Sequence, residues 1–127
     1  MAKAKAVSDS EGRFYGIGFE CPGCRLHTGM SGGHVLPVDW LPEGQEASPH
    51  AVRMYRWGFN GDMERPTFSP SVLTTMPVND RQAFTCHKFI RDGRIEFLSD
   101  CSHALAGQTV ELPNLNEGEG EGQSLEG

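Results

Sequence analysis

The sequence predicts a mainly β protein: a small antiparallel β-sheet domain with a zinc-ribbon-like metal knuckle and at most one short helix. Three observations support this prediction. The 127 residues include 16 glycines and 8 prolines, which favour turns over long helices. Short runs of β-branched and aromatic residues are separated by turn signals. Four cysteines include one Cys-x-x-Cys pair, and a metal staple suits a domain with a modest apolar core.

The composition indicates one domain, residues 13–113, between two tails. Residues 1–12 are small, polar and charged, and we expect a flexible arm there. Residues 114–127 alternate glycine with glutamate, and we expect disorder because so little apolar surface cannot offset chain entropy. No apolar run approaches the roughly 18 residues of a membrane span, and no signal-like segment opens the chain, so we expect a soluble, cytoplasmic protein.

The first half of the domain is predicted to hold three strands. Residues 13–20 form a strand that leads into the cysteine pair. Residues 31–51 carry glycine, proline and serine around isolated apolar residues, which indicates a long loop with one short strand at 34–38. Residues 52–59 alternate in side-chain character and meet Asn60-Gly61, a strong turn signal after a strand.

The second half is predicted to centre on a hairpin over residues 83–99, with Asp92-Gly93 as its two-residue turn. This turn sets Arg91 opposite Arg94, and the alternation of side chains then places Cys86 and His87 on opposite faces.

Three weaker elements flank this hairpin. Residues 62–73 contain Pro66 and Pro70 and can form only an edge strand or an extended segment. Residues 99–107 are predicted to form a single helical turn, and residues 108–113 a last strand.

The four cysteines are predicted to converge on one metal. Cys21 and Cys24 have the spacing with which one tight turn presents both sulfurs, and Pro22-Gly23 suits that turn. Cys101 falls near Cys86 as a diagonal neighbour if the second strand of the hairpin continues, roughly 7 to 8 Å away at Cα. We therefore predict a metal held by Cys21, Cys24, Cys86 and Cys101, with His103 as the alternative fourth ligand. Zinc is the expected metal and iron the alternative.

The remaining histidines are interpreted as ordinary side chains. His87 is expected to be a core or surface histidine on the face opposite Cys86. The others are expected to be solvated: His27, His34 and His50. A thioredoxin-like redox centre is disfavoured because residues 25–33 do not show a helical pattern.

Three stretches carry a resemblance to a known family: CPGC, WGFNGDMERPTFSPSVL and CHKFIRDGRIEFLSDCSHALAGQTVELP. Over residues 14–113 the chain resembles a family of small uncharacterised proteins of tailed phages and bacterial prophages. Members often carry the label ammonia monooxygenase, which the lack of a membrane segment contradicts. The resemblance implies a phage or prophage origin and a zinc site.

These observations favour a non-enzymatic protein in which a structural zinc holds the fold and a surface binds a host or phage protein. The candidate binding surface comprises Trp57, Phe59, Phe68 and Arg65, although ordinary core and turn roles compete for them.

Two alternatives compete with this interpretation. The first is a zinc hydrolase with an open metal position and His87, Asp100 or Glu64 as base. The second is a zinc-ribbon-like nucleic-acid binder, disfavoured by the net charge of −6. Its basic residues would be Arg53, Arg56, Arg65, Arg91 and Arg94.

Overall fold

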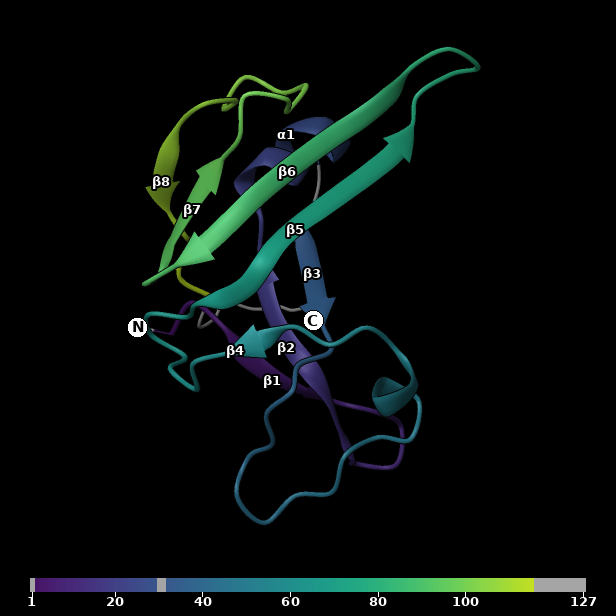
Figure 1. Ribbon diagram of the computed structural model, residues 1–127, viewed down its shortest axis with the longest axis vertical. Coiled ribbons are helices and arrows are strands. Elements are labelled where there is room, and N and C mark those ends of the chain that lie inside the picture. The colour runs from purple at the N-terminus through teal and green to yellow at the C-terminus, as the bar shows by residue number, and fades with distance from the viewer. Residues whose placement is uncertain (1, 30–31, 116–127) are drawn as a thin grey trace.

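A computed structural model of the chain describes residues 2–29 and 32–115, and within them it is mainly β, as predicted. Two antiparallel sheets have the orders β1-β2-β3 and β4-β5-β6-β7-β8 (Figure 1). The strands are β1 (Lys5–Ser8), β2 (Phe14–Glu20), β3 (Gly33–Leu36), β4 (Gly58–Phe59), β5 (Phe68–Pro77), β6 (Ala83–Arg91), β7 (Arg94–Phe97) and β8 (Thr109–Glu111). The helices are α1 (Pro22–Thr28) and the 3-10 turn η1 (Ala51–Arg53).

The β6–β7 hairpin has the predicted register. Asp92 and Gly93 both adopt positive φ, 51° and 77°, as a two-residue hairpin turn of this hand requires. Arg91 faces Arg94 and Lys88 faces Phe97. Side chains therefore alternate along β6, with Cys86 and Lys88 fully buried on the inner face.

Contacts between the two sheets form the core. The ring of Phe19 on β2 lies 5.7 Å from that of Phe68 on β5. Ile90 and Ile95 pair across the hairpin and are fully buried. Apolar residues thus alternate inward along the strands, and their burial is the main force that joins the sheets.

Helix α1 corrects the prediction that residues 25–33 are not helical. Cys21 caps it, because its sulfur accepts a bond from the N–H of Cys24, and Pro22 occupies the first turn, where no backbone donor is needed. Gly29 ends the helix in the left-handed conformation at φ 73°. The knuckle predicted as an isolated turn is therefore the start of a helix, which lies behind β6 in the view of Figure 1.

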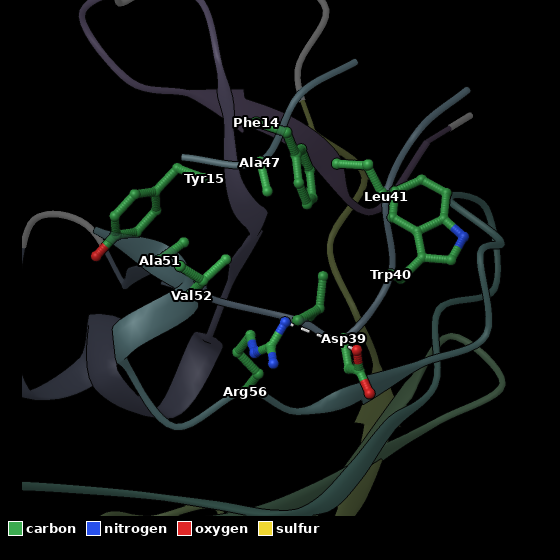
Figure 2. Close-up of a pocket in the computed structure, with 10 residues that line it drawn as sticks. Phe14, Tyr15, Asp39, Trp40, Leu41, Ala47, Ala51, Val52 and Arg56 are labelled. Carbon is green, nitrogen blue, oxygen red and sulfur yellow. Dashed lines mark ion pairs between the residues drawn. The ribbon is translucent and has the colours of Figure 1, made fainter. Parts of the chain in front are cut away.

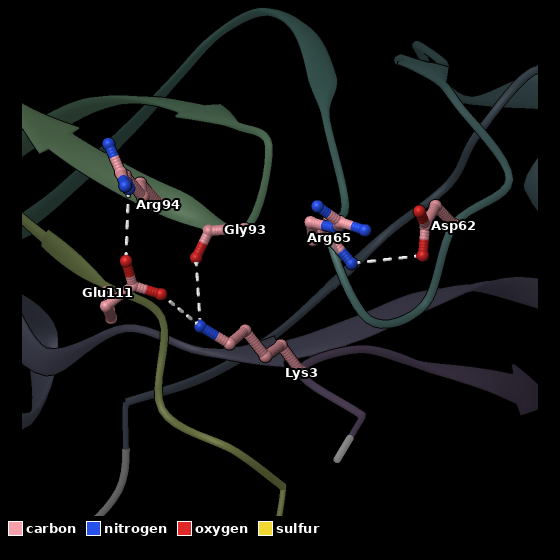
Figure 3. Close-up of polar contacts among 6 residues, drawn as sticks. All are labelled: Lys3, Asp62, Arg65, Gly93, Arg94 and Glu111. Atoms are coloured by element: carbon pink, nitrogen blue, oxygen red, sulfur yellow. Dashed lines mark hydrogen bonds and ion pairs between the residues drawn. The ribbon is translucent and has the colours of Figure 1, made fainter.

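The N-terminal residues also differ from the expected flexible arm. Lys5–Ser8 form β1, paired with β2, and Ala4 is buried. Lys3 binds the carboxylate of Glu111 and the carbonyl of Gly93, while Arg94 binds the same carboxylate (Figure 3). Figure 3 also shows the backbone N–H of Arg65 donating to the carboxylate of Asp62 in the loop before β5. The backbone pairing of β1 orders residues that composition alone marked as polar.

Other predicted elements are shorter than expected or absent. Strand formation in 52–59 is limited to β4, because Trp57 bonds instead to Pro37 and Asp39. Residues 99–107 form hydrogen-bonded turns rather than a helical turn. The expected tail falls outside the described residues from position 116 onward. Among the described helices, none has the length and apolar character needed to cross a membrane.

Candidate active site and thiol cluster

A chain of hydrogen bonds on the outer face of the five-stranded sheet joins a serine, a histidine and an aspartate. The Ser71 Oγ lies 3.0 Å from Nε2 of His87, and Nδ1 of the same ring lies 3.1 Å from Oδ2 of Asp100. A nucleophile, a base and a carboxylate that orients the base are the three parts of a serine-hydrolase triad. The side chains of His87 and Asp100 are 26% and 58% exposed, so solvent and substrate can reach them.

Ser71 is delivered by an irregularity in β5. The register of β5 against β6 shifts between Phe68 and Val72, so that the intervening residues bulge out of the ladder. Bulges beside active sites commonly re-aim one side chain. Beyond the bulge, Leu73 faces His87, which makes Ser71 the diagonal neighbour of that histidine on the same face. The indole N–H of Trp57 donates to the Ser71 carbonyl at 3.2 Å and holds the bulge from outside.

The turn after β7 holds the histidine at two points. Asp100 receives the bond from the His87 ring, and the next residue, Cys101, contacts the His87 backbone. The His87 N–H donates to Cys101 Sγ at 3.2 Å, and the thiol lies 3.1 Å from the His87 carbonyl. Leu98 N–H donates to the same carbonyl at 2.9 Å. One short turn therefore fixes both the backbone and the ring of the base.

A cluster of buried thiols occupies the opposite face of β6. Cys21 Sγ lies 3.7 Å from Cys86 Sγ. Nε2 of His34 lies 3.2 Å from Cys24 Sγ, and Nε2 of His103 lies 3.2 Å from Cys86 Sγ. The donor atoms form two compact groups that could hold a metal ion, Cys21 with Cys24 and His34, and Cys86 with Cys101 and His103. All four cysteines are free and buried.

The spacing of these atoms fits a tetrahedral metal. With zinc–sulfur bonds of about 2.3 Å, two thiolates on one tetrahedron lie about 3.8 Å apart. The Cys21–Cys86 separation of 3.7 Å matches that edge. Nζ of Lys88 is fully buried among the thiols, 3.4 Å from Cys86 Sγ and 3.6 Å from Cys24 Sγ. Its positive charge offsets negative charge in the cluster.

The protonation preferences inside the cluster are unequal. Hydrogen bonds from Cys24 and Cys86 hold the pKa of Cys21 far below its ordinary value, and the same bond network raises the pKa of Cys86. Burial lowers the pKa of His34, but hydrogen bonds to Cys21 and Cys24 outweigh it and raise the pKa overall. Burial lowers the pKa of His103. The opposite directions show that the Cys21 and Cys86 thiols influence each other's ionisation.

The structure brings together most of the predicted metal ligands but changes the surroundings of two residues. Cys101, predicted as a ligand, has its sulfur bonded to the His87 backbone. His34, predicted to be solvated, lies against Cys24, because β3 pairs with β2 next to the knuckle. The sequence offered one signal for His34, its position in a short strand close to the cysteine pair.

The predicted binding surface divides between core and solvent. Phe68 is buried and stacks on Phe59, so it offers no exposed surface. Trp57 and Phe59 are half-buried, and Arg65 is exposed.

Ser71 was not singled out by the sequence. The signal that could have found it was the pair His87 and Asp100, both named as candidate bases without a nucleophile.

Three of the five predicted basic residues are ion-paired in the described structure, which argues against a continuous cationic face. Arg56 pairs with Asp39, Arg91 with Glu96 and Arg94 with Glu111.

Arg56 and Asp39 also border an apolar cavity of about 220 Å³ (Figure 2). Figure 2 shows Tyr15 and Trp40 on opposite sides of this cavity. Arg56, which lines the cavity, directly precedes Trp57, whose indole N–H donates to the carbonyl of Ser71.

One comparison with known proteins identifies a family. The family model described as "Bacterial ubiquitination-like system serine protease (BubE)" matches residues 2–98, a range that includes Ser71 and His87 and ends just before Asp100. Comparisons with curated proteins and with solved structures gave no match. The family description overturns the expectation of a non-enzymatic zinc protein that acts by binding a partner. The hydrolase alternative was closer, although the family chemistry uses serine rather than metal-bound water.

Proposed function

Because the chain belongs to the family of bacterial ubiquitination-like system serine proteases (BubE), we propose that it is a serine protease with Ser71 as nucleophile, His87 as general base and Asp100 as the orienting carboxylate. The observation that carries this proposal is the continuous chain of bonds, 3.0 Å from Ser71 to His87 and 3.1 Å from His87 to Asp100. A family defined by serine chemistry requires such a base, and the triad is recognised by geometry rather than by chain order.

The geometry supports a two-step reaction. The Ser71 hydroxyl donates to Nε2 of His87, which takes the proton as Oγ attacks the substrate carbonyl. The imidazolium then gives that proton to the leaving amine, which leaves an acyl group on Ser71. In the second step His87 takes a proton from water, and the resulting attack releases the acid and restores the serine. Asp100 accepts the Nδ1 hydrogen throughout and so keeps Nε2 available as the base.

The family description motivates a proposal for the substrate. We propose that the substrate is a protein of the same ubiquitination-like system and that the bond cleaved is an amide, as the word protease in the family description suggests. The side chains of His87 and Asp100 are 26% and 58% exposed on the outer face of the sheet, and this solvent access suits a macromolecular substrate. This replaces the host or phage binding partner as the proposed partner class.

The thiol cluster is proposed to bind one structural zinc. Cys21, Cys24 and Cys86 supply three ligands, and either His103 or His34 supplies the fourth. A zinc ion with three thiolates and a neutral histidine carries one net negative charge, which the buried Lys88 balances. Four thiolates would leave an unbalanced charge, and the Cys101 sulfur already serves His87. A four-ligand zinc contributes folding energy and no reaction step.

Covalent labelling tests the proposed triad. A fluorophosphonate probe, which reacts with activated serines, is expected to label the wild-type protein at Ser71, as mapped by peptide mass spectrometry. Ser71→Ala should abolish labelling because the attacking oxygen is removed. Ser69→Ala is the matched control, since Ser69 is an exposed serine two residues away, and its labelling should equal that of the wild type. Labelling at another serine, or none at all, would refute the proposal.

A further inference from the structure

The edge of β5 next to Ser71 has free backbone groups. On β6, His87 and Thr85 direct their carbonyls toward Leu98 and Ser102, away from β5. In an antiparallel pair, successive residues direct their backbone groups alternately toward and away from the partner strand. The β6 residues that bond to β5 are therefore Phe84, Cys86 and Lys88, which face Met76, Thr74 and Val72. The N–H and C=O groups of Leu73 and Thr75 therefore point to the opposite edge.

That edge is unoccupied within the described residues. β4 pairs with β5 only at Phe68 and Ser69. The chain before β4 leaves the edge, because the Trp57 backbone bonds to Pro37 and Asp39 instead. An open stretch of strand edge thus lies beside Leu73 and Thr75, in line with β4. It begins at Trp57, against the carbonyl of Ser71, and ends near Pro77, which has no N–H to offer.

Between its bulge and Pro77, the free edge of β5 carries little of the protection that is usual for an exposed strand. Natural edge strands are kept short or carry charged residues, because open backbone groups invite pairing with other chains. β8, the opposite edge of the same sheet, follows this rule with three residues and an ion-paired Glu111. Residues 71–77 of β5 include no charged side chain, and Leu73 is 57% exposed. An open stretch of edge without charged side chains that starts at the proposed nucleophile indicates that the edge is used.

We propose that the free edge of β5 binds the extended peptide arm of the protein substrate as an added antiparallel strand, an inference that rests on the proposed protease function. Its occupant is the segment on the N-terminal side of the cleaved bond. An antiparallel peptide runs opposite to β5, so its C-terminal end points toward Ser71. Main-chain bonds then give affinity with little demand on sequence, as in other cases of strand addition.

The register of this strand follows from strand geometry. If the carbonyl to be cleaved lies beside Ser71, the residue opposite Leu73 is the third before the cleaved bond, because paired strands advance in step. That residue exchanges two hydrogen bonds with Leu73, and the fifth does the same with Thr75. The second and fourth residues direct their N–H groups away from β5. Only alternate residues of the peptide should therefore need their N–H groups for binding, whereas a nonspecific apolar contact would show no such alternation.

Backbone N-methylation of the peptide tests the register. The probe is a six-residue peptidyl aminomethylcoumarin amide chosen from a positional-scanning library, assayed with the full chain. N-methylation of the third residue before the cleaved bond should lower kcat/KM at least about fivefold, since it removes one hydrogen bond and obstructs the strand. N-methylation of the fourth residue is the control and should change kcat/KM less than twofold. Equal effects at both positions would overturn the proposal.

A proline substitution tests the protein side. Thr75→Pro removes an N–H that points to the free edge and leaves the hydrogen bonds to β6 intact. Strands tolerate proline at such an edge position. It should cancel the gain in kcat/KM that wild-type protein shows when the peptide is lengthened from three to six residues. Thr109→Pro makes the same change on the β8 edge and should preserve that gain.

The possible results separate the two proposals. Wild-type protein that resists the fluorophosphonate refutes the triad and, with it, this inference. Protein that is labelled at Ser71 but cleaves no library peptide, or shows no gain with peptide length, refutes the strand-addition inference alone. A dimer in analytical ultracentrifugation that Thr75→Pro abolishes would also refute it, because the occupant of the edge would then be a second copy of the chain.

Discussion

The outer and inner faces of β6 carry different chemistry on consecutive residues. On the outer face His87 joins Ser71 and Asp100, with a side chain 26% exposed. On the inner face Cys86 and Lys88 are fully buried among thiols and imidazoles. Successive side chains on a strand point to opposite sides, so one strand can hold a reactive site and its structural anchor back to back.

The comparison teaches how a small domain can rigidify an exposed triad. The inner cluster ties β6 to helix α1 through the Cys21–Cys86 contact. The turn that carries Asp100 also carries Cys101, which bonds to the His87 backbone, and His103, which contacts Cys86. The base and its carboxylate are therefore both attached to elements that the cluster holds. The reacting side chains themselves lie on the outer face, so they can be changed without altering a cluster side chain.

The largest expected effect comes from breaking the outer face. Asp100→Asn should lower kcat roughly 10³- to 10⁴-fold, because an amide donates to Nδ1 and fixes the wrong tautomer of His87. Peptide hydrolysis gives kcat, and elemental analysis should find the same metal content as in the wild type. A loss of tenfold or less would show that Asp100 is not part of the catalytic unit.

Breaking the inner face should reduce stability. Cys86→Ser is expected to lose the metal and to lower the free energy of unfolding by about 3 kcal/mol or more, since the binding energy of a structural zinc is folding energy. Elemental analysis and urea denaturation measure both quantities and distinguish zinc from iron. Cys101→Ser is the control. It should keep the metal, because its hydroxyl can replace the bonds to His87. Loss of metal in both variants would restore Cys101 as a ligand.

The smallest effect is expected at the turn that sets both faces. Gly93→Ala places a Cβ 3.2 Å from the Cα of Arg65 on a backbone at φ 77°. The strain should lower the free energy of unfolding by about 1 to 2 kcal/mol. Metal content and kcat should match the wild type, because Asp92 and the pairing of β6 with β7 preserve the register. A change in either would mean that the turn controls more than stability.

Much of the inner face could be predicted from local sequence. The Asp92-Gly93 turn fixes how β6 pairs with β7, and the period of two then separates Cys86 from His87. The Cys21 and Cys24 spacing indicated a metal site without any knowledge of the fold. The ligand role assigned to Cys101 stays a prediction, but its bonds to His87 show that proximity to Cys86 did not determine which way the sulfur points.

Only the tertiary structure assembled the outer face. Ser71 reaches His87 because β5 shifts register between Phe68 and Val72. The turn between β5 and β6 carries no sequence signal that predicts this shift. Asp100 reaches the same ring from a turn whose course depends on the bonds of Leu98 and Cys101 to the β6 backbone. Local signals determined the hairpin, the alternation along β6 and the cysteine knuckle, because each depends on neighbouring residues. The triad was decided by packing, because its three residues meet only once separate segments are aligned.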